Sequence, residues 1–265
     1  MLGLGLNMNT TATQEGGINR VAPYSNDYGI TLDGVGDTVA LGLSDPQMDT
    51  LFTGDFSVSF WVKDSAWATS YIFGFNTTAN AFWVRMLNVG ALYWQTACTH
   101  NSDAGSGGLA AAGSLSTSDY IHVLVSVTAG VGANRGTLKL YADGVEKIST
   151  STATGTNHAA ADIGSGIRFA VGARNTAKNT YDGHASADFD EVALWDTALT
   201  ASEAAAIYNS GESFNLQSDK GNYTSSADLQ YYFRFENDLT DTMGNSNANA
   251  KAVGDATFNQ PANLP

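Results

Sequence analysis

Cysteine and basic residues are scarce in this chain of 265 residues. Cys98 is the single cysteine, so neither an intramolecular disulfide nor a cysteine-based zinc cluster can form. The 12 Lys and Arg residues are outnumbered by 26 Asp and Glu, which gives a net charge of −14. Because nucleic-acid binding needs clustered cations that neutralise phosphates, the sequence predicts no nucleic-acid partner and no attraction to an anionic membrane surface.

Long apolar runs are also absent. Residues 1–7 are largely apolar, but they lack a preceding basic segment and are shorter than the hydrophobic part of a secretory signal, about 7–15 residues. No run approaches the roughly 18 apolar residues that span a bilayer. The sequence therefore predicts a protein that is made in a cytoplasm, carries no signal peptide and does not insert into a membrane.

Aspartate and glycine, by contrast, are abundant. Of the 26 acidic residues 20 are Asp, and 28 residues are Gly. Asp favours turns and sites for hard cations, whereas Glu favours helices. This composition is typical of β-structure with many tight turns. The length predicts one compact domain, because β-sandwiches often extend over about 200–250 residues.

Strand patterns recur along most of the chain. Residues 56–62 alternate, with Phe56, Val58, Phe60 and Val62 on one side and serines on the other, which predicts a half-buried strand. Residues 138–145 predict a hairpin around an Asp-Gly turn. The expected strands, including the two of this hairpin, are residues 28–32, 38–41, 71–75, 82–86, 91–95, 121–128, 136–141, 145–149, 167–171, 229–235 and 256–258.

Other segments predict an arm, loops and a helix. Residues 1–27 are polar and are expected to form an extended arm, and residues 101–118 and 150–165 are predicted as long loops because they lack periodicity. A capping box at Thr200 and Glu203 starts one short helix, which Gly211 ends. The sequence thus predicts an all-β, antiparallel two-sheet sandwich over residues 28–265, with residues 229–265 folding back onto it.

Three stretches carry a family resemblance. Residues 32–39 read LDGVGDTV, residues 56–62 read FSVSFWV, and residues 189–209 include DEVALWDTALTASE. Together they resemble laminin-G-like, concanavalin A-type jelly-roll domains. Residues 231–245 resemble a motif that usually precedes the opening strand of such domains but here follows the helix. Domains ordered in this way are similar to structural proteins of tailed bacteriophages, especially marine ones.

The resemblance implies a jelly-roll fold and a non-enzymatic virion protein, either a capsid decoration or a tail-fibre component. Residues 1–27 would then attach it to other virion proteins, or to further copies of itself in a homo-oligomer, and its long loops would face host-surface glycans. Since a fold does not determine a function, two alternatives stay open. One is a carbohydrate-binding lectin outside any virion, and the other is a degenerate glycoside hydrolase.

The resemblance also implies a calcium ion at a rim of the sandwich. The candidate ligands lie in the first and third motifs, namely Asp33, Asp37, Asp188, Asp190 and Glu191. Calcium takes about six to eight oxygen ligands, and the two acidic groups would converge if the opening strand paired with the strand that contains Asp190. Without a cation, carboxylates so close together would repel one another.

Catalysis is not predicted. Related sandwich glycosidases place carboxylates at positions i, i+2 and i+5 of one strand, flanking the bond to be cut. Asp188 and Asp190 fit the first two positions, but the third is Ala193. The four histidines stand apart without an HExxH motif, and His122 lies within an apolar strand, which predicts a core imidazole.

Aromatic side chains are the candidates for sugar contact, because a flat ring can stack on a pyranose face. The four candidates are Trp67, Trp83, Tyr93 and Trp94. Tyr93 and Trp94 are neighbours on one expected strand and must point to opposite faces. One of these two is therefore expected in the core and the other at the surface.

Overall fold

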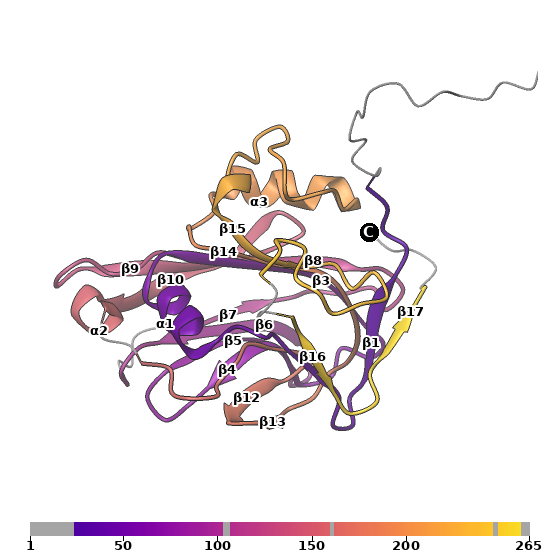
Figure 1. The fold of residues 1–265 in the computed structure, drawn as a ribbon, viewed down its shortest axis with the longest axis horizontal. Helices are drawn as coiled ribbons and strands as arrows, with labels where there is room; N and C mark the ends of the chain where they lie inside the picture. Colours follow the sequence, from indigo (N-terminus) through magenta and orange to yellow (C-terminus); the bar gives the residue numbers. More distant parts are fainter. Residues whose placement is uncertain (1–23, 103–106, 160–161, 246–248, 261–265) are drawn as a thin grey trace, which may run out of the picture.

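The computed structural model describes residues 24–102, 107–159, 162–245 and 249–260, which form a sandwich of two β-sheets (Figure 1). The first sheet, sheet A, has the strand order β10-β9-β8-β3-β14-β1-β17, and β15 also pairs with β14. Its strands are β1 (Gly29–Asp33), β3 (Phe56–Asp64), β8 (Ile121–Val127), β9 (Arg135–Ala142), β10 (Val145–Thr154), β14 (Ser186–Trp195), β15 (Leu229–Phe233) and β17 (Thr257–Asn259).

Sheet B has the order β16-β2-β11-β4-β5-β6-β7, and β12 joins it beside β4 with β13 as its own partner. Its strands are β2 (Thr38–Ala40), β4 (Ser70–Asn76), β5 (Ala81–Asn88), β6 (Leu92–Thr99), β7 (Gly107–Ala111), β11 (Ala170–Val171), β12 (Arg174–Ala177), β13 (Thr180–Asp182) and β16 (Lys251–Val253). The two sheets and few helices confirm the predicted jelly-roll sandwich.

The main hydrophobic core fills the space between the sheets, and β3 shows how the sequence produces it. Phe56, Val58, Phe60 and Val62 all belong to this core, as their alternation predicts. The opposite face of β3 is buried as well, because Trp61 packs against Tyr208 with their ring centroids 6.0 Å apart. The strand is therefore buried on both faces rather than half-buried.

A second hydrophobic cluster covers the outer face of sheet A. It lies beneath α3 (Ala201–Tyr208) and the segment that follows this helix (Figure 1). The predicted capping box is present: the Thr200 Oγ1 accepts from the Glu203 N–H at 3.2 Å, and the Glu203 Oε2 accepts from the Thr200 N–H at 2.9 Å. The helix ends at Tyr208, because Asn209 adopts a left-handed conformation two residues before the predicted stop.

Several elements lie where the sequence indicated loops or turns. Helix α1 (Asp45–Thr53) was not expected, nor was the β12–β13 hairpin. Strand β7 lies within the first predicted loop, while β10 and α2 (Gly155–Ala159) extend into the second. In the part of the chain that the structure describes, no helix is both long enough and apolar enough to cross a membrane.

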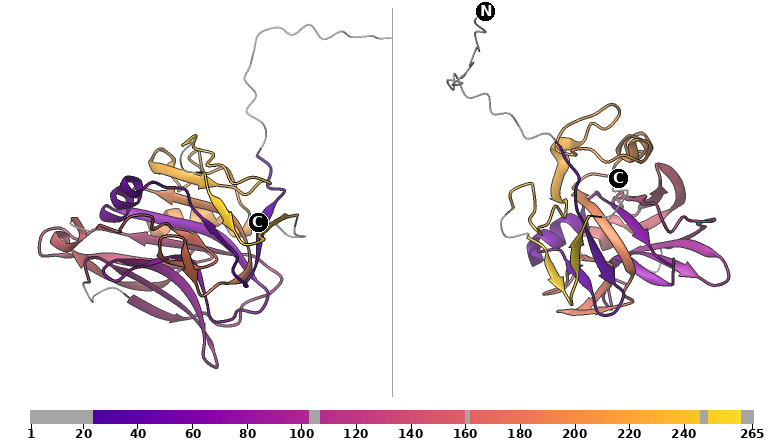
Figure 2. Two further views of the ribbon diagram at one scale, coloured as in Figure 1. Left: turned by 60° about the horizontal axis from the view of Figure 1, so that its bottom comes forward. Right: turned by 90° about the vertical axis from the view of Figure 1, so that its right-hand side faces the viewer.

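The C-terminal strands lie beside the N-terminal ones. Strand β17 pairs with β1, and β16 pairs with β2. Figure 2 shows these yellow strands alongside the indigo start of the described chain. Residues 1–23 of the predicted arm lie outside the described residues, whereas residues 24–27 run over the sandwich next to β14. This arrangement brings residues from both ends of the sequence to one region of the molecule.

Candidate functional site

Three aspartates converge where β1 ends. Asp33 is the last residue of β1, Asp37 precedes β2, and Asp255 lies in the turn between β16 and β17. One carboxylate oxygen from each lies within 4.8 Å of the other two. Asp37 is buried and holds the other two in place, because its Oδ1 accepts from the Asp255 N–H at 2.8 Å and its Oδ2 from the Asp33 N–H at 3.1 Å.

Gly254 allows this close approach. A Cβ atom at position 254 would lie 2.0 Å from the Asp37 Oδ1, and the backbone there has a φ of +85°, which glycine adopts without strain. Asp33 and Asp255 are exposed, so an ion could reach the group from solvent. Three converging carboxylates are the hard oxygen ligands that calcium prefers, and the residues present therefore fit a calcium ion.

The other three predicted ligands lie elsewhere. The expected pairing of β1 with β14 is present, but its register places Asp33 opposite Ser186 and Thr31 opposite Asp188. Asp188 forms an ion pair with Lys63 at 3.0 Å and accepts from the Thr31 hydroxyl at 2.5 Å. The two predicted acidic groups therefore do not merge, and Asp255 takes the place that the sequence assigned to the second group.

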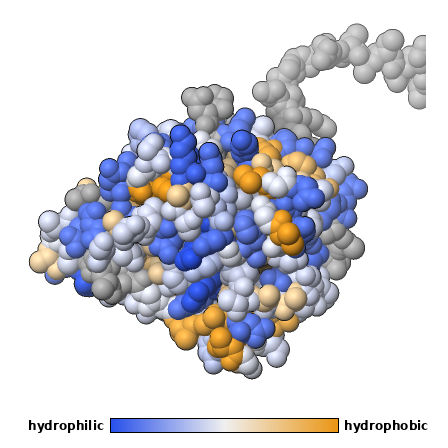
Figure 3. Space-filling view, turned by 90° about the horizontal axis from the view of Figure 1, so that it is seen from below, coloured by the Kyte–Doolittle hydropathy of each residue, from blue (hydrophilic) through white to orange (hydrophobic). Residues whose placement is uncertain are grey.

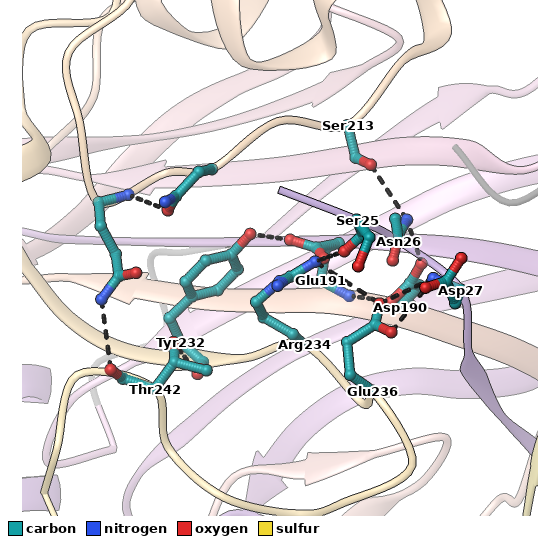
Figure 4. A network of polar contacts seen from close by, with 12 residues as sticks. Ser25, Asn26, Asp27, Asp190, Glu191, Ser213, Tyr232, Arg234, Glu236 and Thr242 are labelled. Atoms are coloured by element: carbon teal, nitrogen blue, oxygen red, sulfur yellow. Dashed lines mark hydrogen bonds and ion pairs between the residues drawn. The ribbon is translucent and has the colours of Figure 1, made fainter. Parts of the chain in front are cut away.

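Asp190 and Glu191 belong to a buried polar network around Arg234 (Figure 4). The Arg234 Nε lies 3.0 Å from the Glu191 Oε1, and the Tyr232 hydroxyl donates to the Glu191 Oε2. Asp190 is fully buried and accepts from the Asn26 side-chain amide at 2.8 Å. A β-bulge explains why these consecutive acids share one side of the sheet: the register with β3 shifts after Asp190, and Glu191 has a φ of 51°.

This network attaches residues 24–27 to the sandwich. Arg234 donates to the Ser25 carbonyl and lies over the Tyr24 ring, 4.4 Å from its centroid. The Asp27 N–H donates to both Glu236 carboxylate oxygens at 3.1 Å. Burial raises the pKa of Glu191 to about 8 although Arg234 opposes this shift, and burial together with the nearby Glu191 raises the pKa of Asp190. Residues 24–27 thus pack against two buried carboxyl groups, those of Asp190 and Glu191, and one guanidinium, that of Arg234.

The positions of the acidic residues on β14 also bear on catalysis. Asp190 is inaccessible to a substrate, and the Asp188 carboxylate is held by Lys63. Ala193, the third position of the glycosidase pattern, lies in the cluster beneath α3. Within the described residues, this strand offers no pair of exposed carboxylates on either side of a cleft, which glycoside hydrolysis requires.

Two of the four aromatic candidates are core residues. Trp67 and Trp94 are 2% and 1% exposed and pack edge to face with centroids 6.0 Å apart. The expectation that they contact a sugar is wrong, since both lie inside the inter-sheet core. Tyr93 and Trp83 are half-buried, so the predicted division between Trp94 and Tyr93 is confirmed, and only these two of the four candidates can meet a ligand.

Histidine and cysteine side chains meet in a way that the sequence did not predict. The His100 and His158 ring centroids are 3.5 Å apart, and the Cys98 Sγ lies 3.8 Å from the His100 Nδ1. Burial raises the pKa of the Cys98 thiol and lowers the pKa of His158, which disfavours a reactive thiolate. His122 is a core imidazole as predicted, with a pKa that burial lowers to about 3.

A pocket of about 580 Å³ opens beside β2, β16 and the β12–β13 turn. Its polar lining comes from Arg168, Lys178, Asn179, Tyr181, Asn249 and Lys251, and small or apolar residues form the rest. Asp45 pairs with the Arg168 Nη1 at 2.6 Å, which lowers the pKa of Asp45 to about 2. The polar lining residues are separated by up to 83 positions in sequence (251 − 168), so no local sequence motif predicts the pocket.

Comparisons with known proteins agree with the fold. Residues 33–205 match a laminin-G-type family model described as the concanavalin A-like lectin/glucanases superfamily. No curated protein matches the chain significantly. A SAP-like pentraxin from Limulus polyphemus, which is heptameric, is similar in structure with a TM-score of 0.50 and 13% identity, over 86% of this chain and 95% of the pentraxin.

Two further solved structures are similar. A protein of Bacteroides ovatus that is described as carbohydrate binding aligns with a TM-score of 0.59 and 13% identity, over 90% of this chain and 61% of that protein. The CBM40 domain of a Ruminococcus gnavus IT-sialidase, solved with α2,3-sialyllactose, aligns with a TM-score of 0.50 and 13% identity, over 68% of this chain and 96% of the domain. At this identity these structures establish the fold alone.

Proposed function

This chain belongs to the concanavalin A-like lectin/glucanase superfamily, and we propose that it acts as a non-catalytic carbohydrate-binding module. The observation that carries the proposal is the pocket of about 580 Å³ beside β16, which combines amide and cationic groups with the half-buried Tyr181 ring. Pockets of this size suit small ligands. Two proteins of similar fold are named for carbohydrate binding, and the buried Asp190 argues against hydrolysis.

Glycan-array binding of the purified chain tests this proposal. We expect retention of at least one glycan class and a loss of at least tenfold in affinity for Tyr181→Ala, because Tyr181 is the aromatic residue of the pocket lining. Tyr28→Ala is the matched control, since Tyr28 is a half-buried tyrosine outside the pocket lining and is not among the aromatic candidates for sugar contact. An array without any retained glycan, or equal losses in the two variants, would contradict a glycan site in this pocket.

We further propose that the module is displayed on a bacteriophage particle, in a capsid or a tail, through residues 1–27. The attachment of residues 24–27 to the sandwich by Arg234, Glu236 and Asp190 supports this second proposal, since it gives the preceding chain a fixed point of departure. The partners would be other virion proteins or further copies of this chain, and the protein would reside in the virion.

Deleting residues 1–23 tests the display proposal without disturbing the network. We expect the truncated protein to keep its melting temperature and its glycan binding but to lose its association with particles. Copurification with particles measures association with other virion proteins, and sedimentation of the purified protein measures association between copies of this chain. Undiminished association of the truncated protein with particles would exclude this role for the deleted segment.

We also propose that Asp33, Asp37 and Asp255 hold a calcium ion. Their mutual approach to within 4.8 Å and the exposed position of two of them support this proposal. The ion would neutralise the converging carboxylates and connect β1 with the turn before β17. It would serve structure rather than chemistry, because the pocket beside β16 is lined by none of the three aspartates.

A further inference from the structure

Basic residues concentrate in one pocket of an otherwise acidic protein. The pocket beside β16 is lined by three of the 12 Lys and Arg residues, Arg168, Lys178 and Lys251, and by none of the 26 Asp and Glu. In a chain with a net charge of −14, most of the surface repels an anion. A pocket lined by three cationic residues and by no acidic one is therefore a local exception to the overall electrostatics.

Two of these cations have no acidic partner within the part of the chain that the structure describes. Among the described residues, neither Lys178 nor Lys251 forms an ion pair. By contrast, Lys63 pairs with Asp188 at 3.0 Å and Lys139 with Glu146 at 2.9 Å. An ammonium group supplies three donors, so the two lysines can offer charge and hydrogen bonds to a ligand without breaking an existing ion pair.

Arg168 is held differently from the lysines. Its Nη1 contacts the Asp45 Oδ1 and the Ile167 carbonyl oxygen, both at 2.6 Å. These two bonds orient a planar guanidinium that carries five N–H donors in all. Because the Arg168 side chain is already oriented, less conformational entropy is lost when a ligand binds. A fixed guanidinium favours planar or tetrahedral anions.

The remaining polar groups suit the rest of a sugar. Asn179 and Asn249 bring amides that both donate and accept, and Tyr181 brings a half-buried ring and a hydroxyl. The face of the molecule on the side of β12 and β13 is largely hydrophilic, with hydrophobic residues in small separate groups (Figure 3). Such a face lacks the contiguous apolar patch that marks many protein-docking surfaces, and it favours a polar ligand.

We propose that this pocket binds an acidic sugar, one that carries a carboxylate or a sulfate ester, with Lys178, Lys251 and Arg168 receiving the anionic group. The inference rests on the proposed carbohydrate-binding function and names the class of its ligand. Both anionic groups offer the same chemistry to cationic donors, and the net charge of the protein then opposes binding of the same polymer elsewhere on the surface.

Three probes separate the possibilities: polygalacturonate for carboxylates, dextran sulfate for sulfate esters and dextran as the neutral polymer. Affinities are measured by surface plasmon resonance in 50 and 500 mM NaCl, about the range over which exposed charges become screened. We expect Lys178→Gln/Lys251→Gln to weaken acidic-polymer binding at least tenfold in 50 mM NaCl. The higher salt concentration should weaken the wild type more than this variant.

A second double variant controls for the change in net charge. Lys147→Gln/Lys220→Gln removes the same charge from exposed positions outside the pocket lining, and we expect its affinity to stay within twofold of the wild type. If the pocket variant loses affinity for only one acidic polymer, the pocket is selective for carboxylates or for sulfate esters. If it loses affinity for both, the pocket accepts either anion. Acidic-polymer affinity that is equal in the two double variants would overturn the inference.

The neutral probe and a glycan array distinguish the failure of this inference from failure of the proposed function. Binding of dextran or of neutral array glycans alone, with equal affinity in the wild type and the pocket variant, would overturn the acidic-sugar inference and leave the carbohydrate-binding function standing. Binding of no polymer and no array glycan would overturn both. Acidic-polymer binding that depends on the two pocket lysines supports both.

Discussion

Asp190 and Glu191 show how a single backbone conformation determines the chemistry of two residues. The β-bulge with a φ of 51° at Glu191 brings both carboxyl groups into one buried network. Burial then raises the pKa of each group, that of Glu191 from 4.5 to about 8. Because protonation is easier in the folded state, Glu191 contributes most to stability below pH 4.5, and this contribution is lost as the pH rises through about 8.

Replacing Glu191 by Gln should flatten the dependence of stability on pH. The amide keeps the size of the side chain and an oxygen that can accept from Tyr232, but it does not titrate. We expect the free energy of unfolding of the wild type to fall between pH 5 and 8.5 more steeply than that of Glu191→Gln, as measured by urea denaturation. The exposed Glu212→Gln serves as the control, and parallel pH profiles for wild type and Glu191→Gln would refute the prediction.

The acidic and aromatic candidates show what a sequence can and cannot predict about single residues. Asp33 and Asp37 stand four positions apart in one turn, so their proximity follows from local geometry. Asp255 joins them from 218 positions beyond Asp37 (255 − 37), because β17 returns to β1. The burial of Trp67 also depends on a distant strand, since Trp94 covers it. Local patterns therefore predicted part of the aspartate group and misplaced this ring.

At the scale of elements, α3 is secured at its start and along its side. The Glu203 carboxylate accepts from Thr200 within the capping box and, through its Oε1, from the Ser225 hydroxyl at 2.6 Å. These bonds lower the pKa of Glu203 although burial opposes them. The helix covers the second hydrophobic cluster, with Ala204 and Ile207 buried on sheet A, so its cap also stabilises the outer layer.

Thr200→Ala should destabilise the protein by about 1 kcal/mol, the usual cost of removing a side-chain N-cap. The variant loses the acceptor for the Glu203 N–H, which lies 3.2 Å from the Thr200 Oγ1. Urea denaturation followed by circular dichroism measures the change. Ser202→Ala, at an exposed position in the first turn, should be neutral or slightly stabilising because alanine favours helices. Equal losses in the two variants would argue against a role for the cap.

Helices and strands that have a pattern in their own sequence could be predicted. Those that form only by pairing with a distant strand could not. The period-two alternation of β3 and the capping box of α3 both depend on nearby residues. Helix α1 has a similar signature, with Ser44 and Gln47 forming a capping box, but only three of its nine residues are buried and its apolar stripe is correspondingly short. Strand β7 is formed by small residues that pair with β6, and nothing within its own sequence indicates a strand.

At the scale of the whole molecule, the sandwich depends on strands contributed by both ends of the sequence. Strand β17 lies at the edge of sheet A against β1, and β16 lies at the edge of sheet B against β2. The aspartate group connects these pairs, because Asp33 ends β1 and Asp255 lies between β16 and β17. A calcium ion at this position would link the N-terminal and C-terminal strands of the two sheets.

Calcium should therefore raise the melting temperature of the wild type. At a concentration one hundred times the dissociation constant, a ligand stabilises the folded state by about 2.7 kcal/mol, and each kcal/mol shifts the melting temperature by about 2–4 °C for a protein of roughly this size. We expect calcium in excess over EDTA to raise it by roughly 5–10 °C. Differential scanning calorimetry with and without EDTA measures the shift.

Asp255→Asn provides the decisive comparison. It removes one of the three converging charges while the Asp255 N–H can still donate to Asp37, so the turn keeps its conformation. In EDTA the variant should melt at or above the temperature of the wild type, because less charge repulsion remains. In calcium it should melt below the wild type, because a ligand is missing.

Asp119→Asn, at an exposed position outside the group, should follow the wild type in both conditions. A wild-type melting curve that calcium does not move would exclude the ion, and a calcium shift of equal size in Asp255→Asn would place the ion elsewhere in the molecule.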